Sequence, residues 1–528
     1  MIRLFVLMIC GIFIFSCHHN ETSSSAETPV EATGPNIVFI MADDMGWNEV
    51  GFNGEMNHTP HIDKLRTEGV SLTQFYVHAV CAPSRAAFLT GRYPFRTWSD
   101  WRSEDFGKPG YLEMLGLELK QNSAGEDTRM IHGLPTDEWT IAEALKEAGY
   151  FTAIAGKWHC GEWLPEHLPM GQGFDHQYGH YAWGIDYTNY TIPHNAPARF
   201  AVYDWHRNQQ PIAEDGYTTD LIANEVVHLL ETHEENHGEQ PFFYYVPFNA
   251  IHGPLEEIPR YTDLLEKRYA ALKCLDDAVG RIVGALDQYG FNENTVLVFT
   301  NDNGGLRPNM NAPYRGTKNT NYEGGVRSPC LIRWPRKIQP NSTNDGIMHI
   351  TDFFDTFLSL ANVDGDGRMP SALNETRFQR DAFDMKNMIL RGADSPRDEI
   401  IYEVSGSVRQ PAIRLGDHKL IGNELFNISR DPYETNNIAE ANPDIVDRLR
   451  KRVTSVGEER PPMPDVSRLM SPALPWVYGR DENTTAPQWV KDRLRPIRAA
   501  QPQEWAPGTT PWPQPPTDGK IIYTGDGR

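Results

Sequence analysis

Apolar runs that alternate with amphipathic stretches predict buried β-strands connected by helices along most of this 528-residue chain. Four of these runs are rich in β-branched or aromatic residues and too short for a helix, which is typical of strands buried on both faces of a parallel sheet. They cover Pro35–Met41, Phe151–Ala155, Phe242–Val246 and Thr295–Thr300. Strands that alternate with helices predict an α/β fold, with a large mixed, mostly parallel sheet sandwiched by helices.

Apolar residues at helical spacing predict the helices that cover this sheet. One is expected from Thr140 to Ala148, where Gly149 is suited to end it, and another from roughly Tyr261 to Tyr289. A third stretch, from His349 to Leu360, is expected to close the main domain.

Shorter elements follow the main domain. Strands at Asp398–Tyr402 and Ala412–Leu415 and a helix from Ile438 to Val453 predict a smaller α+β subdomain. Residues 461–528 are rich in proline, which leaves open a disordered tail or an extended arm around the body, and their Trp and Tyr residues favour the arm. The expected division is a signal peptide (1–16), a flexible tether (17–34), a catalytic domain (35–394), the α+β subdomain (395–460) and the tail (461–528).

The N-terminus is typical of an exported protein. Arg3 precedes an apolar run, Leu4–Phe15, that is too short to span a bilayer but fits the core of a signal peptide. Ile14-Phe15-Ser16-Cys17 resembles a bacterial lipoprotein cleavage site, at which Cys17 would become the lipidated first residue. The alternative is a simple secretory signal that is cut nearby. We therefore expect a lipid anchor at a bacterial membrane, in the periplasm or at the cell surface.

Charge and cysteine content narrow the function further. A net charge of −22 argues against nucleic acid as a partner, because binding its phosphates requires a basic surface. Cys81, Cys160, Cys274 and Cys330 lie beyond the signal, at spacings that match neither a zinc ribbon nor a disulfide framework. A disulfide between two of them stays open.

Polar residues follow each of the four predicted strands. Asp43 and Asp44 come after the first strand, Lys157 after the second, His252 after the third and Asp302 after the fourth. In parallel sheets, functional groups gather at the carboxyl ends of the strands. The pattern predicts that these side chains share one site.

The run Cys81-Ala-Pro-Ser-Arg85-Ala-Ala-Phe-Leu-Thr-Gly-Arg92 resembles, throughout its length, the C-x-P-S-R-x-x-x-L-T-G-R signature of formylglycine-dependent (type I) sulfatases. These belong to the alkaline phosphatase superfamily, and the overall pattern is most similar to arylsulfatase B-like bacterial polysaccharide sulfatases. The resemblance implies an alkaline phosphatase-like fold and a maturation enzyme that oxidises Cys81 to formylglycine (3-oxoalanine). Its hydrated aldehyde would attack sulfur, and its second hydroxyl would allow sulfate to leave.

The resemblance also implies a metal site. Asp43, Asp44, Asp302 and Asn303, with the modified Cys81, would hold the ion. Carboxylate and amide oxygens suit Ca²⁺ or Mg²⁺ rather than zinc. The family resemblance favours Ca²⁺.

Five further residues lie in segments that resemble the family's catalytic elements. Lys157 would hold a sulfate oxygen, His159 would take a proton from the hydrated aldehyde, and Arg85 would stabilise that group. His252 would donate a proton to the leaving sugar oxygen, and Lys318 would bridge that oxygen and sulfate. Three cations and a metal would make the pocket positive within an acidic protein.

Substrate selectivity is expected from the segments 97–134 and 162–190 and from the tail. Aromatic and basic side chains there suit a sulfated polysaccharide or oligosaccharide, such as ulvan, carrageenan or a glycosaminoglycan. The alternative is that these segments only pack against the body. The candidate substrate-binding residues are Trp98, Arg102, Trp163, His180 and Trp183.

Two other functions fit the same sequence less well. One is a formylglycine-dependent phosphodiesterase or phosphonate hydrolase of the same superfamily, whose pocket would contain similar parts. The other is an inactive carbohydrate-binding lipoprotein, which should have lost at least one catalytic residue. The chain retains all six: Cys81, Arg85, Lys157, His159, His252 and Lys318.

Overall fold

The structure is a computed structural model. It describes residues 34–54, 59–97, 99, 120–121, 127–130, 133–161, 165–191, 202–261, 266–363, 379–404, 409–461, 470–471 and 486–500. Predictions made for the signal peptide, Cys17, Trp98, Arg102 and Trp163 lie outside these residues.

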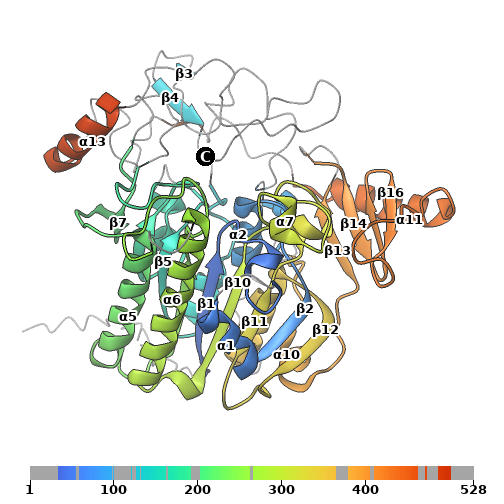
Figure 1. Cartoon of the computed structure of the whole chain (residues 1–528), viewed down its shortest axis with the longest axis horizontal. Coiled ribbons are helices and arrows are strands. Elements are labelled where there is room, and N and C mark those ends of the chain that lie inside the picture. The colour runs from blue at the N-terminus through green and yellow to red at the C-terminus, as the bar shows by residue number, and fades with distance from the viewer. Residues whose placement is uncertain are drawn as a thin grey trace, which may run out of the picture.

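Ten strands of the described residues form one central sheet (Figure 1). They are β1 (Asn36–Ala42), β2 (Val70–Tyr76), β5 (Phe151–Lys157), β6 (His176–His180), β7 (His206–Arg207), β8 (Gln210–Pro211), β9 (Phe242–Pro247), β10 (Thr295–Asn301), β11 (Cys330–Arg333) and β12 (Ser342–His349). Their order is β12-β2-β11-β10-β1-β9-β5-β6-β7-β8. The middle strands β10, β1, β9, β5 and β6 are parallel, as are β2 and β12, whereas β11, β7 and β8 are antiparallel to their neighbours.

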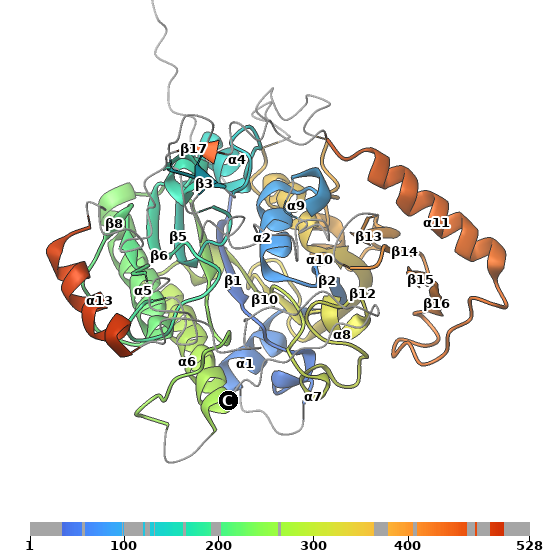
Figure 2. The ribbon, with the colours of Figure 1, turned by 90° about the horizontal axis from the view of Figure 1, so that it is seen from above.

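Helices cover both faces of this sheet, as seen from above in Figure 2. Helices α1 (Pro60–Glu68), α5 (Thr218–His237) and α6 (Lys267–Gln288) lie on one face, and α2 (Cys81–Thr90), α4 (Ile141–Glu147) and α9 (Phe353–Leu360) lie on the other. Shorter helices are α7 (Pro308–Asn311), α8 (Glu323–Val326) and α10 (Lys386–Arg391). The 3₁₀ helices are η1 (Trp47–Glu49), η2 (Pro94–Arg96), η4 (Pro165–His167), η5 (Pro169–Gln172), η7 (Asn292–Asn294) and η8 (Ile350–Asp352).

Strand β1 illustrates why the predicted apolar runs are strands. Successive side chains of a strand point to opposite faces of the sheet. Ile37, Phe39 and Met41 pack into the core with α2, α4 and α9, while Val38 and Ile40 pack into the core with α1, α5 and α6. A strand covered on both faces must be apolar throughout, and the predicted α/β fold with a mostly parallel sheet is confirmed.

The C-terminal part forms a four-stranded antiparallel sheet of β13 (Glu399–Glu403), β14 (Ala412–Leu415), β15 (His418–Ile421) and β16 (Glu424–Asn427), with α11 (Pro443–Glu458) beside it. The two predicted strands are confirmed. The predicted helix start at Ile438 is wrong, because Pro443 occupies the first turn of α11, where its missing N–H costs nothing. Similarly, α6 begins at Lys267 rather than near Tyr261, which lies in a turn.

Two described elements of the tail were not predicted. Strand β17 (Met470–Ser471) pairs with β4 (Asp127–Met130), which also pairs with β3 (Lys120–Gln121). Helix α13 (Gln488–Ala500) lies near β7 in Figure 1 and near β8 in Figure 2. Among the described helices, none is both long and apolar enough to cross a membrane.

The open question of a disulfide is answered for the four cysteines beyond the predicted signal. Cys81, Cys160, Cys274 and Cys330 all belong to the described residues, and each is buried with a free thiol.

Candidate active site

The polar residues that follow the central strands meet at one edge of the sheet. β10, β1, β9 and β5 are parallel neighbours, so their carboxyl ends lie side by side. Asp43 directly follows β1 and Asp302 directly follows β10. His252 lies in the loop after β9, and Lys157 is the last residue of β5, which is two residues longer than predicted. The structure therefore brings the predicted residues into one site.

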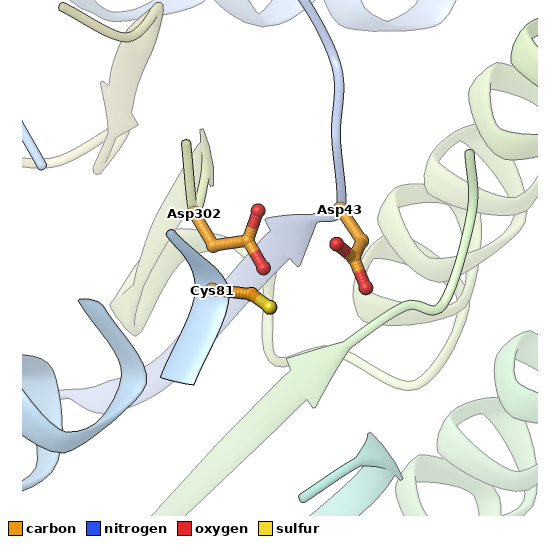
Figure 3. Close-up of side chains that lie close together, drawn as sticks. All are labelled: Asp43, Cys81 and Asp302. Atoms are coloured by element: carbon orange, nitrogen blue, oxygen red, sulfur yellow. The ribbon is translucent and has the colours of Figure 1, made fainter. Parts of the chain in front are cut away.

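Cys81 enters this site as the first residue of α2. Its side chain lies beside the carboxylates of Asp43 and Asp302 (Figure 3), and ligand atoms of the three residues all lie within 4.8 Å of one another. All three side chains are buried. Burial raises the pKa of the Cys81 thiol, although Lys157 and Lys318 act to lower it.

Arg85 follows Cys81 by one helical turn and therefore points to the same side of α2. Its Nη2 lies 2.7 Å from Oδ2 of Asp302 and 3.5 Å from Oδ2 of Asp43. Its Nη1 donates to the carbonyl of Lys157 at 3.0 Å, and Lys157 Nζ donates to Asp43 Oδ2 at 2.5 Å. Two fully buried cations thus lie beside the carboxylates, where each offsets a charge that burial would otherwise disfavour.

The carboxylates carry opposite pKa shifts. Burial acts to raise the pKa of Asp43, but Lys157, His252 and Arg85 outweigh it and hold this pKa well below its usual range. Burial, followed by repulsion from Asp43, raises the pKa of Asp302 to about 7. The second shift reflects carboxylates crowded into a buried site.

A divalent cation fits this group of oxygens. Asp43 Oδ1 and Asn303 Oδ1 are buried and have no hydrogen-bond partner among the described residues. Asp44 lies in the same set, because its Oδ1 accepts from Asn303 Nδ2 at 2.8 Å. Buried oxygens without donors, next to a carboxylate of raised pKa, are suited to a hard ion such as Ca²⁺ or Mg²⁺.

Lys318 and His252 form the outer side of the site around Asp44. Lys318 Nζ donates to Asp44 Oδ1 at 2.5 Å, and His252 Nε2 lies 3.7 Å from Asp44 Oδ2. Their side chains are 10% and 16% exposed, compared with 0% for Arg85 and Lys157. A ligand from solvent therefore meets Lys318 and His252 first.

His159 is suited to accept a proton. Burial lowers its pKa well below the usual value, and the charges of Lys157 and Arg85 lower it further, so its ring is neutral at pH 7. His159 has φ = 55° and Asp44 has φ = 60°, left-handed conformations that cost a non-glycine residue about 1 kcal/mol. Such conformations persist where surrounding contacts hold them, which is common in active sites.

Two of the predicted substrate-binding residues belong to the described part of the chain. The ring of Trp183 is half-buried, with its centroid 6.0 Å from that of the His252 ring. His180 is fully buried in the strand next to Lys157, with its Nδ1 4.0 Å from Asp204 Oδ2. Substrate contact stays a prediction for both.

Sequence reasoning missed two supports of the site. Arg268 of α6 donates to the carbonyl of Asp44 at 2.9 Å and forms an ion pair with Glu49 at 2.6 Å. Asn301 accepts from the Met45 amide at 3.1 Å and donates to the Met45 carbonyl at 2.6 Å. Asn301 could have been found from its place before Asp302, whereas Arg268 has no local signal.

The family follows from comparison with known proteins. The family model Sulfatase matches residues 35–363 of this chain. The chain belongs to the sulfatase family. It is therefore a sulfuric ester hydrolase, and the resemblance seen in the Cys81 run is confirmed.

Individual relatives agree with this assignment. Arylsulfatase J of Mus musculus is 30% identical to this sulfatase over 494 residues, which cover 81% of this chain and 77% of that protein. N-acetylgalactosamine-6-sulfatase of Mus musculus is 33% identical over 380 residues, 66% of this chain and 68% of that protein. The crystal structure of Ps i-CgsB in complex with k-i-k-neocarrahexaose has a TM-score of 0.67 and 28% identity, covering 81% of this chain and 94% of that one.

Proposed function

We propose that this sulfatase removes sulfate esters from a sulfated polysaccharide or its oligosaccharides, using formylglycine made from Cys81 and a bound Ca²⁺. The observation that carries the proposal is Cys81 at the start of α2, beside the carboxylates of Asp43 and Asp302, which pair with Arg85 and Lys157. A structural cysteine has no need of such surroundings.

Three cations are placed to bind the sulfate group. Lys157 and Arg85 lie on the buried side of Asp43, and Lys318 lies on the outer side of Asp44. The sulfate oxygens would enter past Lys318, which we expect to contact both sulfate and the leaving oxygen. Hydrogen bonds from ionised donors to an anion are strong in a buried site, because water does not compete for them.

The metal and the modified cysteine supply the remaining chemistry. Asp43, Asp44, Asp302 and Asn303 would hold Ca²⁺, whose positive charge would offset the charge that develops on the sulfate group. Formylglycine at residue 81 would supply a nucleophile with two hydroxyl groups. Arg85, one turn along α2, would hold that group in place.

The two histidines would transfer protons in opposite directions, with His159 as acceptor and His252 as donor. His159 has a strongly lowered pKa, so its neutral ring would accept a proton beside residue 81. Burial also lowers the pKa of His252, although Asp44 and Asp43 act to raise it. A bound sulfate adds a further negative charge, which favours the protonated ring. His252 would then donate to the leaving oxygen.

A sulfated glycan is supported by the relatives and by the rim of the site. N-acetylgalactosamine-6-sulfatase acts on a sulfated amino sugar, and Ps i-CgsB binds k-i-k-neocarrahexaose, as their names state. Trp183 lies beside His252, where a leaving sugar would lie. Ulvan, carrageenan and glycosaminoglycans are the substrate classes to test. The sequence at Cys17 supports export and a lipid anchor at a bacterial membrane, in the periplasm or on the cell surface.

Mass spectrometry combined with turnover tests the proposal. The protein is produced with a formylglycine-generating maturation enzyme, and the peptide with residue 81 is examined for loss of the thiol. Released sulfate is then measured on defined oligosaccharides from the three classes, and an aryl phosphodiester is assayed in parallel. We expect sulfate release by the converted protein and none above background by Cys81→Ala.

Metal removal provides a second check. A chelator should abolish turnover, and Ca²⁺ should restore it more fully than Mg²⁺. Unchanged turnover in Cys81→Ala would refute the formylglycine nucleophile. Faster turnover of the diester than of any sulfate ester would instead assign a phosphodiesterase.

A further inference from the structure

Helix α13 of the tail packs against the segment that borders the active site. Its apolar side chains Val490 and Leu494, one turn apart, are buried in the core cluster that also contains Tyr190 and Tyr203. Trp489 meets the Tyr203 ring edge-on, with centroids 5.2 Å apart. The contact therefore joins the tail to the segments 182–191 and 202–217.

Arg493 of α13 contacts both of these segments. Its Nη2 donates to the carbonyl of Thr188 at 3.1 Å, and its Nη1 donates to the carbonyl of Glu214 at 3.3 Å. Its guanidinium also lies over the rings of Tyr190 and Tyr203, at 5.0 and 5.6 Å from their centroids. Only a planar, forked cation can make all four contacts at once, so lysine would be a poor substitute.

The segment held by Arg493 in turn holds the main chain of His252. Tyr187 precedes Thr188, and its hydroxyl donates to the carbonyl of His252 at 2.8 Å and to that of Asn249 at 3.1 Å. Trp183 lies against the His252 ring. Gly184 leaves room for that ring, because a Cβ there would lie 3.2 Å from His252 Cε1.

We propose that helix α13 is a brace for the leaving-group side of the active site and that Arg493 is a positioning residue for His252. The inference rests on the proposed role of His252 as proton donor. Contacts run from Arg493 to the Thr188 carbonyl, and from the adjacent Tyr187 to the His252 carbonyl. Loss of the brace would let the His252 loop move relative to the leaving oxygen, while the buried cations and carboxylates around Cys81 stay in place.

Leaving-group dependence distinguishes this role from general destabilisation. A proton donor matters most when the leaving oxygen is strongly basic. Such donors raise the reaction rate by about 10²- to 10⁴-fold. For Arg493→Ala we expect kcat/KM to fall about 10-fold or more on sulfated sugars and alkyl sulfates, because part of the rate contribution of the proton donor is lost. On aryl sulfates with acidic phenols, which leave without a proton donor, we expect kcat/KM to fall less than about 2-fold. Partial unfolding would lower both rates by the same factor.

Matched variants and a second readout complete the experiment. Arg493→Lys should recover part of the loss. Arg495→Ala, on the same helix and paired only with Asp492 among the described contacts, should match wild type. In a His252→Ala background, Arg493→Ala should cause no further substrate-dependent loss. Hydrogen exchange should accelerate in Arg493→Ala at residues 183–191 and 249–253 but not in β1 or β10.

Two results would overturn the brace: an equal loss on all substrates, or unchanged exchange at residues 183–191 and 249–253. A different result would count against the proposed function instead. If His252→Ala itself shows no dependence on the leaving group, His252 is not the proton donor, and hydrogen exchange alone then decides whether α13 holds this loop.

Discussion

Lys419 is predicted to be a large contributor to the stability of the C-terminal subdomain. Its ammonium is fully buried, 2.8 Å from Glu323 Oε1 and 3.0 Å from Glu434 Oε1. Replacement by methionine keeps the apolar stem and removes the charge. Glu323 would retain Arg327, whose Nη1 lies 3.2 Å away. Among the described residues, the Glu434 carboxylate would retain only the amide of Glu323 at 2.7 Å. Glu434 is thus the carboxylate left without a cation.

The cost should depend on pH, because the pKa of Glu434 lies in an accessible range. Burial, with repulsion from Glu323, raises this pKa from its usual 4.5 to about 7 despite Lys419. Because the pKa is raised in the folded state, protonated Glu434 contributes its full stabilisation below about pH 4.5. This stabilisation is lost as the pH rises through 7. Loss of Lys419 raises the pKa of Glu434 further, so at pH 8 the folded Lys419→Met variant must hold a proton on Glu434 that the wild-type protein has mostly released. This adds about 1.4 kcal/mol to the cost of the lost hydrogen bonds, because pH 8 lies about one unit above the wild-type pKa. At pH 5.5 Glu434 is protonated, and only the lost hydrogen bonds remain, about 1–2 kcal/mol.

Native-state hydrogen exchange of β14 and β15 measures this cost locally. The ratio of exchange rates between variant and wild type should be on the order of 10² at pH 8 and about 10 at pH 5.5, since each 1.4 kcal/mol is a factor of ten. Adding Glu434→Gln should restore most of the protection at pH 8. Lys451→Met, an exposed lysine of α11, is the matched control and should leave exchange unchanged. Equal ratios at the two pH values, or no rescue by Glu434→Gln, would refute the reasoning.

Two further substitutions test single contacts. Asp276 is buried, accepts the amides of His61 and Ile62 at the start of α1, and has its pKa raised to about 6 by burial. The stabilisation by its protonated form is therefore lost as the pH rises through 6. Asp276→Asn, which stays neutral, should raise the urea midpoint at pH 8 but not at pH 4. Asp276→Ala removes the acceptor of the two amides and should lower the free energy of unfolding by about 1 kcal/mol. Gly184→Ala would press a Cβ against the His252 ring and should lower kcat on sulfated sugars about 10-fold. Gly284→Ala, which adds a Cβ in open space on α6, is the control and should leave kcat unchanged. An unchanged kcat in Gly184→Ala would show that the ring has room to move.

The sheet and the main site could be predicted from the sequence because their signals are local. A strand such as β1, buried on both faces, must be an apolar run, and Asp43 follows it directly. The same holds for Asp302 after β10. Parallel order then brings separate strand ends together, so position along the chain implies position in space. Arg268 has no such signal, since it reaches the Asp44 carbonyl from the middle of the chain through the packing of α6.

Helix α13 shows where this kind of prediction stops. Its buried apolar side chains are Val490 and Leu494, and Ala486 lies just before the helix. Charged residues surround them, and Pro496 lies inside the helix. Isolated helices of this length are marginal in water, so most of the stability of such a helix comes from the surface that it covers. That surface, with Tyr190 and Tyr203, lies nearly 300 residues earlier in the chain. The helix and its contact with the active-site loop thus arise together. Neither can be predicted from the tail alone, and the effect of Arg493 on His252 becomes apparent only when both segments are seen in place.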